Sequence, residues 1–173
     1  MNSMTNGKYL IKCFLIMLIC FVIDSTISYF LPYNFTKSSF IAIPYIALMM
    51  FCMMVKTIDA PERYFFAATC GVYYSVVYTN SLPVYILMFT FVAFARTYIY
   101  KFEKLSFFES LLFSILTICT QETVVYWLMK LTRITTIKFI PLITLRIFPT
   151  ILLNLILFCV VYLFFNLFVK GEY

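Results

Sequence analysis

The sequence predicts an all-α, polytopic membrane protein whose six transmembrane helices form a single domain over residues 1–173. Apolar residues make up 64% of the chain, and charged residues make up 12%, about half of their share in an average soluble domain. A soluble domain of this size cannot bury so much apolar surface, and the low charge excludes disorder. The apolar runs do not alternate with polar residues, as strands of a membrane β-barrel would.

The first two predicted spans differ in how well the sequence defines them. Residues 9–31 form a long, mainly apolar run that Pro32 closes. This run has no small-residue cleavage site of the kind that ends a signal peptide, so we expect it to stay as an anchor. Residues 40–55 form the second predicted span, although Pro44 interrupts it.

Turn residues and charges separate the other four predicted spans. Residues 64–79 end at the turn-like sequence of residues 80–83, and residues 84–100 follow directly. The last two spans cover residues 107–129 and 147–169. Because each spanning helix needs about 20 residues, the loops are short, and no room remains for a catalytic domain outside the membrane.

The distribution of basic residues favours an orientation with both termini in the cytoplasm. Lysine and arginine in short loops collect on the cytoplasmic side of membrane proteins. With the amino terminus inside, eight of the 13 basic residues fall in cytoplasmic segments. The loop at 130–146 argues the other way, because it places four basic residues outside.

The chain lacks the residue patterns of enzymes and of metal sites. Its six cysteines lie inside apolar runs without a CxxC pair, and it has no histidine, so we interpret the cysteines as small apolar residues. No nucleophile–base set and no glycine-rich phosphate loop is present. We therefore expect a non-enzymatic protein with no catalytic residue, metal or cofactor. Its net charge is +6. We interpret this charge as a determinant of orientation in the lipid bilayer and expect no binding of nucleic acid.

Several charged residues fall inside the predicted spans or directly at their edges, and a charge inside a span is energetically costly. Asp24, Glu122 and Arg146 lie in the predicted outer half of the membrane, so Glu122 and Arg146 are expected to pair, with Asp24 as the rival partner. Arg96 and Glu109 form a second expected pair near the inner ends of their helices. An ion or substrate path is one interpretation, and charge pairs that fix helix register are the other. The absence of histidine and of a dense acidic relay favours the second.

Small residues at four-residue spacing mark two expected packing faces. One face comprises Ala67, Gly71, Ser75 and Thr79, and the other comprises Ser106, Ser110 and Ser114. Such faces allow helix backbones to approach closely within lipid. We expect them to pack within this chain, with contact to a partner chain as the alternative.

The start of the predicted sixth span carries the most specific pattern, formed by Arg146, Pro149, Thr150 and Asn154. Proline suits the first turn of a helix, where its missing N–H would be unsatisfied anyway. Thr150 and Asn154 are one turn apart, so they project from one face and require partners on another helix. The pattern resembles the carboxy-terminal signature of the MreD family of rod shape-determining proteins, whose last helix opens with the same four residues at the same spacing.

Two further segments resemble the same family. Gly71 and Ser75 match a Gly-x-x-x-Asp stretch of the third helix, with serine where the acid is common. Glu122 is similar to an acidic residue often found in the fifth helix. The length and the six-span layout also fit, so the resemblance covers nearly the whole chain.

The resemblance implies a scaffold subunit of the cell-wall elongation and cell-shape machinery in the bacterial plasma membrane. Such a subunit docks MreC, a single-span protein with a large extracytoplasmic domain, and connects with MreB and with peptidoglycan synthases. The residues that would support the docking conformation are Arg146, Pro149, Thr150, Asn154, Glu122 and Gly71. The family is similar in fold to the S components of energy-coupling factor transporters, which implies an S-component-like bundle.

An S component that binds a vitamin-like ligand is the alternative function. Tyr73, Tyr74, Tyr78 and Trp127 are candidates to line a pocket, although tyrosine and tryptophan also gather at membrane interfaces. S components usually carry an Ala-x-x-x-Ala face on the first helix for their coupling partner. Residues 15–29 contain no alanine, which weakens this alternative.

Overall fold

The computed structural model describes residues 3–30, 41–59, 62–78, 82–99 and 106–169, which are helical apart from short connections and contain no strand. This confirms the all-α prediction. The helices are α1 (Ser3–Phe30), α2 (Ile46–Met54), α3 (Glu62–Tyr78), α4 (Leu82–Tyr98), α5 (Phe107–Leu131), α6 (Phe139–Leu142), the π-helical turn η1 (Ile143–Ile147) and α7 (Phe148–Phe168).

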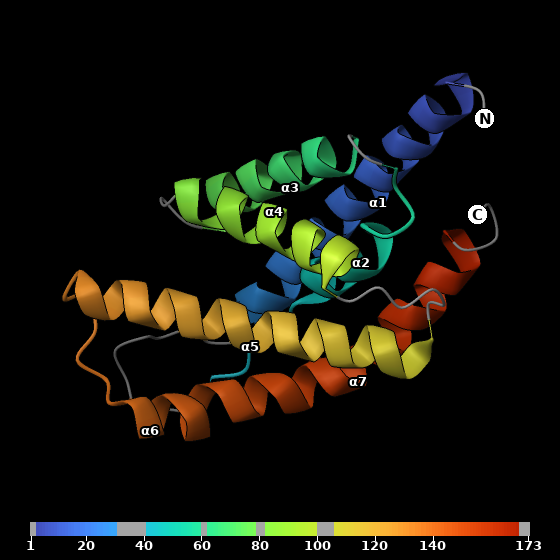
Figure 1. Ribbon diagram of the computed structural model, residues 1–173. Coiled ribbons are helices and arrows are strands. Elements are labelled where there is room, and N and C mark those ends of the chain that lie inside the picture. Colours follow the sequence, from blue (N-terminus) through green and yellow to red (C-terminus); the bar gives the residue numbers. More distant parts are fainter. Residues whose placement is uncertain (1–2, 31–40, 60–61, 79–81, 100–105, 170–173) are drawn as a thin grey trace.

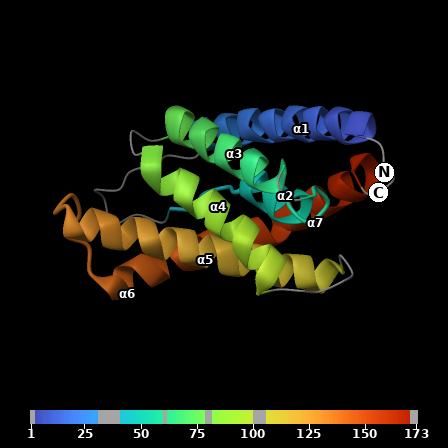
Figure 2. The same ribbon diagram turned by 45° about the horizontal axis from the view of Figure 1, so that its top comes forward.

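The short helix α2 occupies the centre of the molecule (Figures 1 and 2). It contacts α1, α4, α5 and α7, while α3 and α4 pack against each other as an antiparallel pair. A second antiparallel pair is formed by α5 and α7. Helix α1 begins and α7 ends on the same side of the molecule (Figure 2).

Within the described residues, three helical stretches are long and apolar enough to cross a membrane: Gly7–Phe30, Phe107–Leu131 and Phe139–Phe168. The last has 30 residues and therefore a length of about 45 Å, more than the hydrocarbon thickness of a bilayer. Helix α4 has a shorter apolar part, Pro83–Tyr98. The structure thus supports a membrane protein with three helices of spanning length, of the six predicted.

The prediction of one helix over residues 40–55 is wrong in its first half. Residues 41–45 are extended, and α2 contains only nine residues. Pro44 explains the difference, because a proline disfavours helical geometry at the residue before it. Residues 47–54 of α2 are all buried, so this apolar sequence lies inside the bundle and not against lipid.

The last helix begins earlier than predicted, at Phe139 and not at residue 147. The π turn joins α6 to α7, and the N–H of Phe148 donates to the carbonyl of Ile143, five residues earlier. Such a widened turn occurs as a single-turn bulge within a longer helix, and helices commonly bend at such bulges and at prolines. Arg146 and Pro149 therefore lie inside a long helical rod and not at its first turn.

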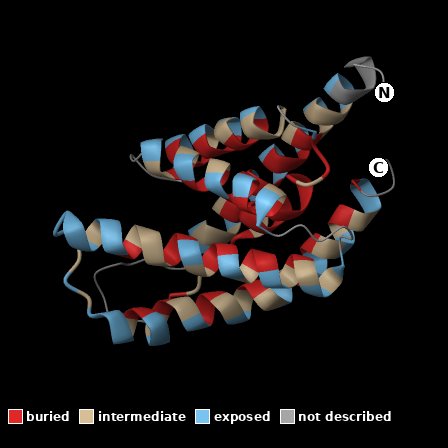
Figure 3. Cartoon of the chain, in the orientation of Figure 1, coloured by how far each residue is buried: buried red, intermediate tan, exposed pale blue. Residues whose placement is uncertain are grey.

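Helix α1 presents apolar side chains to both the interior and the exterior. Cys13 and Met17 are buried against the core, whereas Ile11, Leu15 and Val22 are exposed on the opposite face. Figure 3 shows the buried residues concentrated around α2 and the exposed ones on the outer surfaces of the long helices. Exposed apolar residues on this scale fit helices that face lipid.

Gly71 lies at a close approach of α3 to the backbone of α4. A Cβ atom on Gly71 would lie 2.6 Å from the Cα of Ile86 and 2.8 Å from the carbonyl oxygen of Tyr85. Ala67 and Ser75 on the same face are fully buried. This confirms the expectation that the first small-residue face packs within the chain; Thr79 lies outside the described residues.

We expect Gly71→Ala to destabilise the protein by about 1–3 kcal/mol, because the new methyl group would meet backbone atoms that cannot move aside cheaply. Gly7→Ala is the matched control, since a Cβ there meets nothing within 4 Å. Thermal unfolding in mild detergent measures both variants. A Gly71→Ala midpoint equal to that of Gly7→Ala would contradict the close approach.

Candidate functional site

An extended segment, residues 41–45, lies beside the start of α7 and is held there by hydrogen bonds. Pro149 has no N–H with which to reach the carbonyl of Leu145 four residues earlier. The N–H of Ile41 donates to that carbonyl instead, at 2.9 Å. The proline thus leaves open a backbone acceptor that the extended segment uses.

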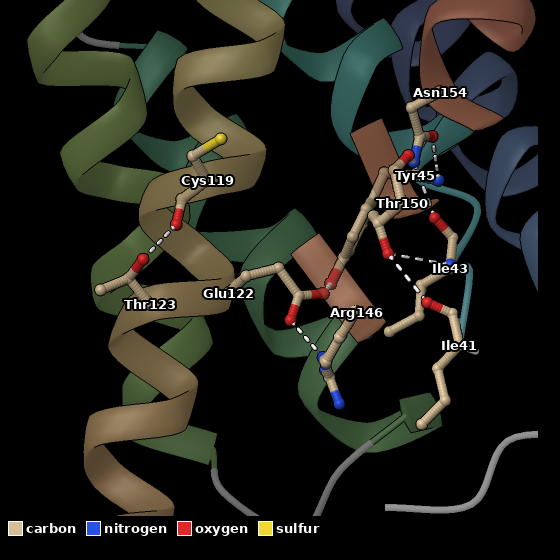
Figure 4. A network of polar contacts seen from close by, with 9 residues as sticks. All are labelled: Ile41, Ile43, Tyr45, Cys119, Glu122, Thr123, Arg146, Thr150 and Asn154. Carbon is tan, nitrogen blue, oxygen red and sulfur yellow. Dashed lines mark hydrogen bonds and ion pairs between the residues drawn. The ribbon is translucent and has the colours of Figure 1, made fainter. Parts of the chain in front are cut away.

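Thr150 and Asn154 bind the same edge of the segment, as Figure 4 shows. The Thr150 hydroxyl accepts from the N–H of Ile43 at 3.3 Å and donates to the carbonyl of Ile41 at 3.5 Å. The Asn154 amide accepts from the N–H of Tyr45 at 2.8 Å and donates to the carbonyl of Ile43 at 2.7 Å. In an extended chain, every second residue presents its N–H and its carbonyl on the same edge. Thr150 and Asn154, one helical turn apart, therefore bind residues 41, 43 and 45 along that edge.

Asp24 of α1 caps the amino end of α2. Its two carboxylate oxygens accept the N–H groups of Ile46 at 2.9 Å and Ala47 at 2.8 Å. These N–H groups have no acceptor within their own helix, and the positive end of the helix dipole stabilises a negative charge there. Asp24 is only 3% exposed, so this contact explains why an acid is present inside the first span. The expectation that Asp24 rivals Glu122 as the partner of Arg146 is wrong.

Glu122 and Arg146 form a buried ion pair, which confirms the predicted pairing. The Arg146 Nε donates to Glu122 Oε2 at 2.5 Å, and the Tyr45 hydroxyl donates to Glu122 Oε1 at 2.6 Å. Both charged side chains lie in the interior. Tyr45 therefore links the ion pair between α5 and η1 to the extended segment.

These contacts form one network that we call the segment lock, defined by Asp24, Glu122, Arg146, Thr150 and Asn154. Extended backbone at membrane depth is tolerated only where protein groups satisfy it, and the lock supplies those groups. Its two acids each have a partner of opposite charge, Arg146 for one and the α2 amino terminus for the other. Its contacts hold one backbone conformation and contain no chain of protonatable groups typical of a proton relay.

The structure brings together five of the six predicted site residues, since Pro149 joins Arg146, Thr150, Asn154 and Glu122 at the segment. The sixth, Gly71, lies between α3 and α4, away from this network. Sequence reasoning missed Tyr45 and the backbone of residues 41–45. The signal for them was Pro44, which disfavours a continuous helix there.

The second predicted ion pair does not form. Arg96 has no hydrogen-bonded or charged partner within 4 Å among the described residues, and Glu109 therefore does not bind it directly. Within the same residues, no group of three or more cysteine, aspartate and glutamate side chains is placed to hold a metal ion.

The aromatic residues of the alternative function do not meet in one place. Tyr73 and Tyr74 of α3 both contact the ring of Phe21. Trp127 of α5 is 53% exposed, and the side chain of Tyr78 lies outside the described part of the chain. Tyr73 and Tyr74 thus pack against the core, whereas Trp127 lies on the outer surface.

No protein-family model, no curated protein and no solved structure matches the chain. The resemblance to MreD proteins therefore rests on the sequence alone, and the similarity to S components rests on that resemblance.

Proposed function

We propose that the chain is a non-enzymatic scaffold of the bacterial cell-wall elongation machinery, which docks MreC and connects it with MreB and peptidoglycan synthases. One observation carries the proposal. The four residues of the signature pattern, Arg146, Pro149, Thr150 and Asn154, all act on the extended segment or on the ion pair that holds it. The four residues thus share one structural role, which supports reading their spacing as a family signature.

The proposal includes six membrane crossings, of which residues 41–54 make the second. Five extended residues at about 3.3 Å each and nine helical residues at about 1.5 Å each add up to about 30 Å, the hydrocarbon thickness. Helices α3 and α4, with 17 residues each, reach about 25 Å. An even number of crossings agrees with termini on one side, which the basic residues place in the cytoplasm.

The proposed role follows from rigidity at the outer end of the bundle. With both termini in the cytoplasm, the segment lock lies in the outer half of the membrane, towards the extracytoplasmic domain of MreC. Binding of a partner to such a surface costs less conformational entropy when the surface is already held in one conformation. The lock therefore acts as a support for docking and not as a site of chemistry.

The test is recovery of MreC with the tagged full chain from bacterial membranes in mild detergent. We expect Pro149→Leu to reduce recovery at least fivefold at matched folded amounts, because the new N–H competes with that of Ile41 for the Leu145 carbonyl. Thr123→Val is the control, since Thr123 bonds only to the carbonyl of Cys119 within its own helix.

Absence of MreC from the wild-type isolate would overturn the assignment. Equal recovery with wild type and Pro149→Leu would instead separate the segment from docking. A stoichiometric small organic ligand in the wild-type isolate, found by native mass spectrometry without MreC, would favour the S-component alternative.

A further inference from the structure

Arg96 is a buried cation whose donors have no acceptor among the described residues. It lies near the carboxyl end of α4 and is 2% exposed. All three of its side-chain nitrogens, Nε, Nη1 and Nη2, are buried without a hydrogen-bond partner in the described part of the chain. A guanidinium is always charged and carries five N–H donors. Leaving such a group buried and unbonded is far more costly than leaving a neutral one unbonded.

Helix α5, whose Phe113 ring contacts Arg96, adds further unbonded donors. Ser110 and Ser114 are 2% and 1% exposed, and both hydroxyls are buried with no hydrogen-bond partner among the residues described. The ring of Phe113, between them in sequence, lies 4.9 Å from the guanidinium carbon. Cys52 of α2 lies close to both Arg96 and Ser114. Three helices thus bring the guanidinium and the two hydroxyls to one corner of the bundle.

This corner lies at the end of the bundle opposite the segment lock. Arg96 is two residues before the end of α4, and Ser110 lies in the first turn of α5. The start of α3 joins the same end, because Arg63 donates to the hydroxyl of Thr97 at 2.6 Å. Helix ends of this kind sit near the membrane–water interface, where the phosphate groups of lipids and dissolved anions are both present.

We propose that Arg96, Ser110 and Ser114 bind a phosphate group, supplied by a phospholipid headgroup or by free phosphate. The planar fork of a guanidinium matches two phosphate oxygens, and a bonded anion removes the cost of burying the charge. The two serine hydroxyls, one helical turn apart, donate to the remaining oxygens.

Glu109 favours a ligand that carries a hydrogen-bond donor beside its phosphate group. Its carboxylate acts electrostatically on Arg96, and its Oε2 atom is also buried without a hydrogen-bond partner among the described residues. A ligand that carries a donor beside the phosphate satisfies this oxygen. Inorganic phosphate offers its P–OH group, and phosphatidylethanolamine offers its ammonium group.

Two binding measurements on the full chain distinguish the two sources. In the first, inorganic phosphate is titrated by calorimetry into protein in a maltoside detergent. In the second, native mass spectrometry counts the lipids retained from nanodiscs of phosphatidylcholine with or without phosphatidylethanolamine. We expect saturable binding in at least one arm, and Arg96→Gln is expected to weaken it about tenfold or more, because hydrogen bonds to a charged group are lost.

Lys138→Gln is the control for charge, because Lys138 is an exposed basic residue in the loop after α5, and its binding is expected to equal that of wild type. Should Arg96→Gln not fold, the double variant Ser110→Ala with Ser114→Ala keeps the guanidinium and is expected to weaken binding about fivefold or more. No saturable binding in either arm overturns the proposal. Binding by the folded variants at wild-type affinity overturns it as well.

Discussion

Replacing Arg146 with alanine is expected to destabilise the protein by about 3–5 kcal/mol, because it leaves the buried carboxylate of Glu122 without its cation. Glu122 is 1% exposed and lies between Arg146 and the hydroxyl of Tyr45. A carboxylate in that position can neither reach water nor find another described cation. Unfolding in a series of detergent–denaturant mixtures measures the loss.

The control is the double variant Glu122→Gln with Arg146→Met, which removes both charges and keeps an acceptor for the Tyr45 hydroxyl. We expect it to recover most of the lost stability, because replacing both members of a buried pair is often nearly neutral. A double variant as unstable as Arg146→Ala would show that the stability comes from arginine contacts other than the ion pair.

The second large effect is expected at Asn154, which holds the extended segment by two of its backbone groups. Asn154→Leu leaves the N–H of Tyr45 and the carbonyl of Ile43 unbonded in the interior, and each such group costs about 1–3 kcal/mol. The amides of residues 41–47 are then expected to exchange with solvent deuterium faster than in the wild type. Hydrogen-exchange mass spectrometry in nanodiscs reports this directly.

Two threonine variants serve as comparisons for the exchange rates of Asn154→Leu. Thr150→Val removes two long bonds between the segment and α7 and is expected to cost about 1 kcal/mol. Thr123→Val removes only a bond within α5 and is expected to leave exchange of the segment unchanged. Unchanged exchange in Asn154→Leu would mean that this side chain does not hold the segment.

The sequence predicted the helical class, most helix positions and the Glu122–Arg146 pair, because each depends on local composition or on charge. The sequence-based prediction was wrong where a single proline changed the path of the backbone. Pro44 was visible in the sequence, yet the second apolar run was long enough to be interpreted as a helix, and only nine of its residues are helical. Likewise, Pro149 was assigned to a helix start, whereas the π turn continues the helix through it.

The functional interpretation of the polar residues changed in the same way. Asp24 was expected to face Arg146, but its partners are backbone N–H groups that exist only because α2 begins at Ile46. Arg96 was expected to pair with Glu109, and the structure instead leaves its guanidinium buried over the ring of Phe113, without a hydrogen-bond partner among the described residues. Spacing in the sequence cannot reveal contacts between residues of distant helices, because these depend on how the helices cross.

The sequence by itself determined the helical class and an apolar composition that fits a membrane protein, because a soluble domain of this size cannot bury so much apolar surface. It also marked the few charged residues as the most informative ones. Only the tertiary structure decided what those residues do. It showed that Asn154 binds the backbone of an extended segment, that Asp24 caps the helix that follows this segment, and that the Glu122–Arg146 pair binds the Tyr45 hydroxyl. Unbonded backbone groups in an apolar interior must find partners wherever the packed helices supply them.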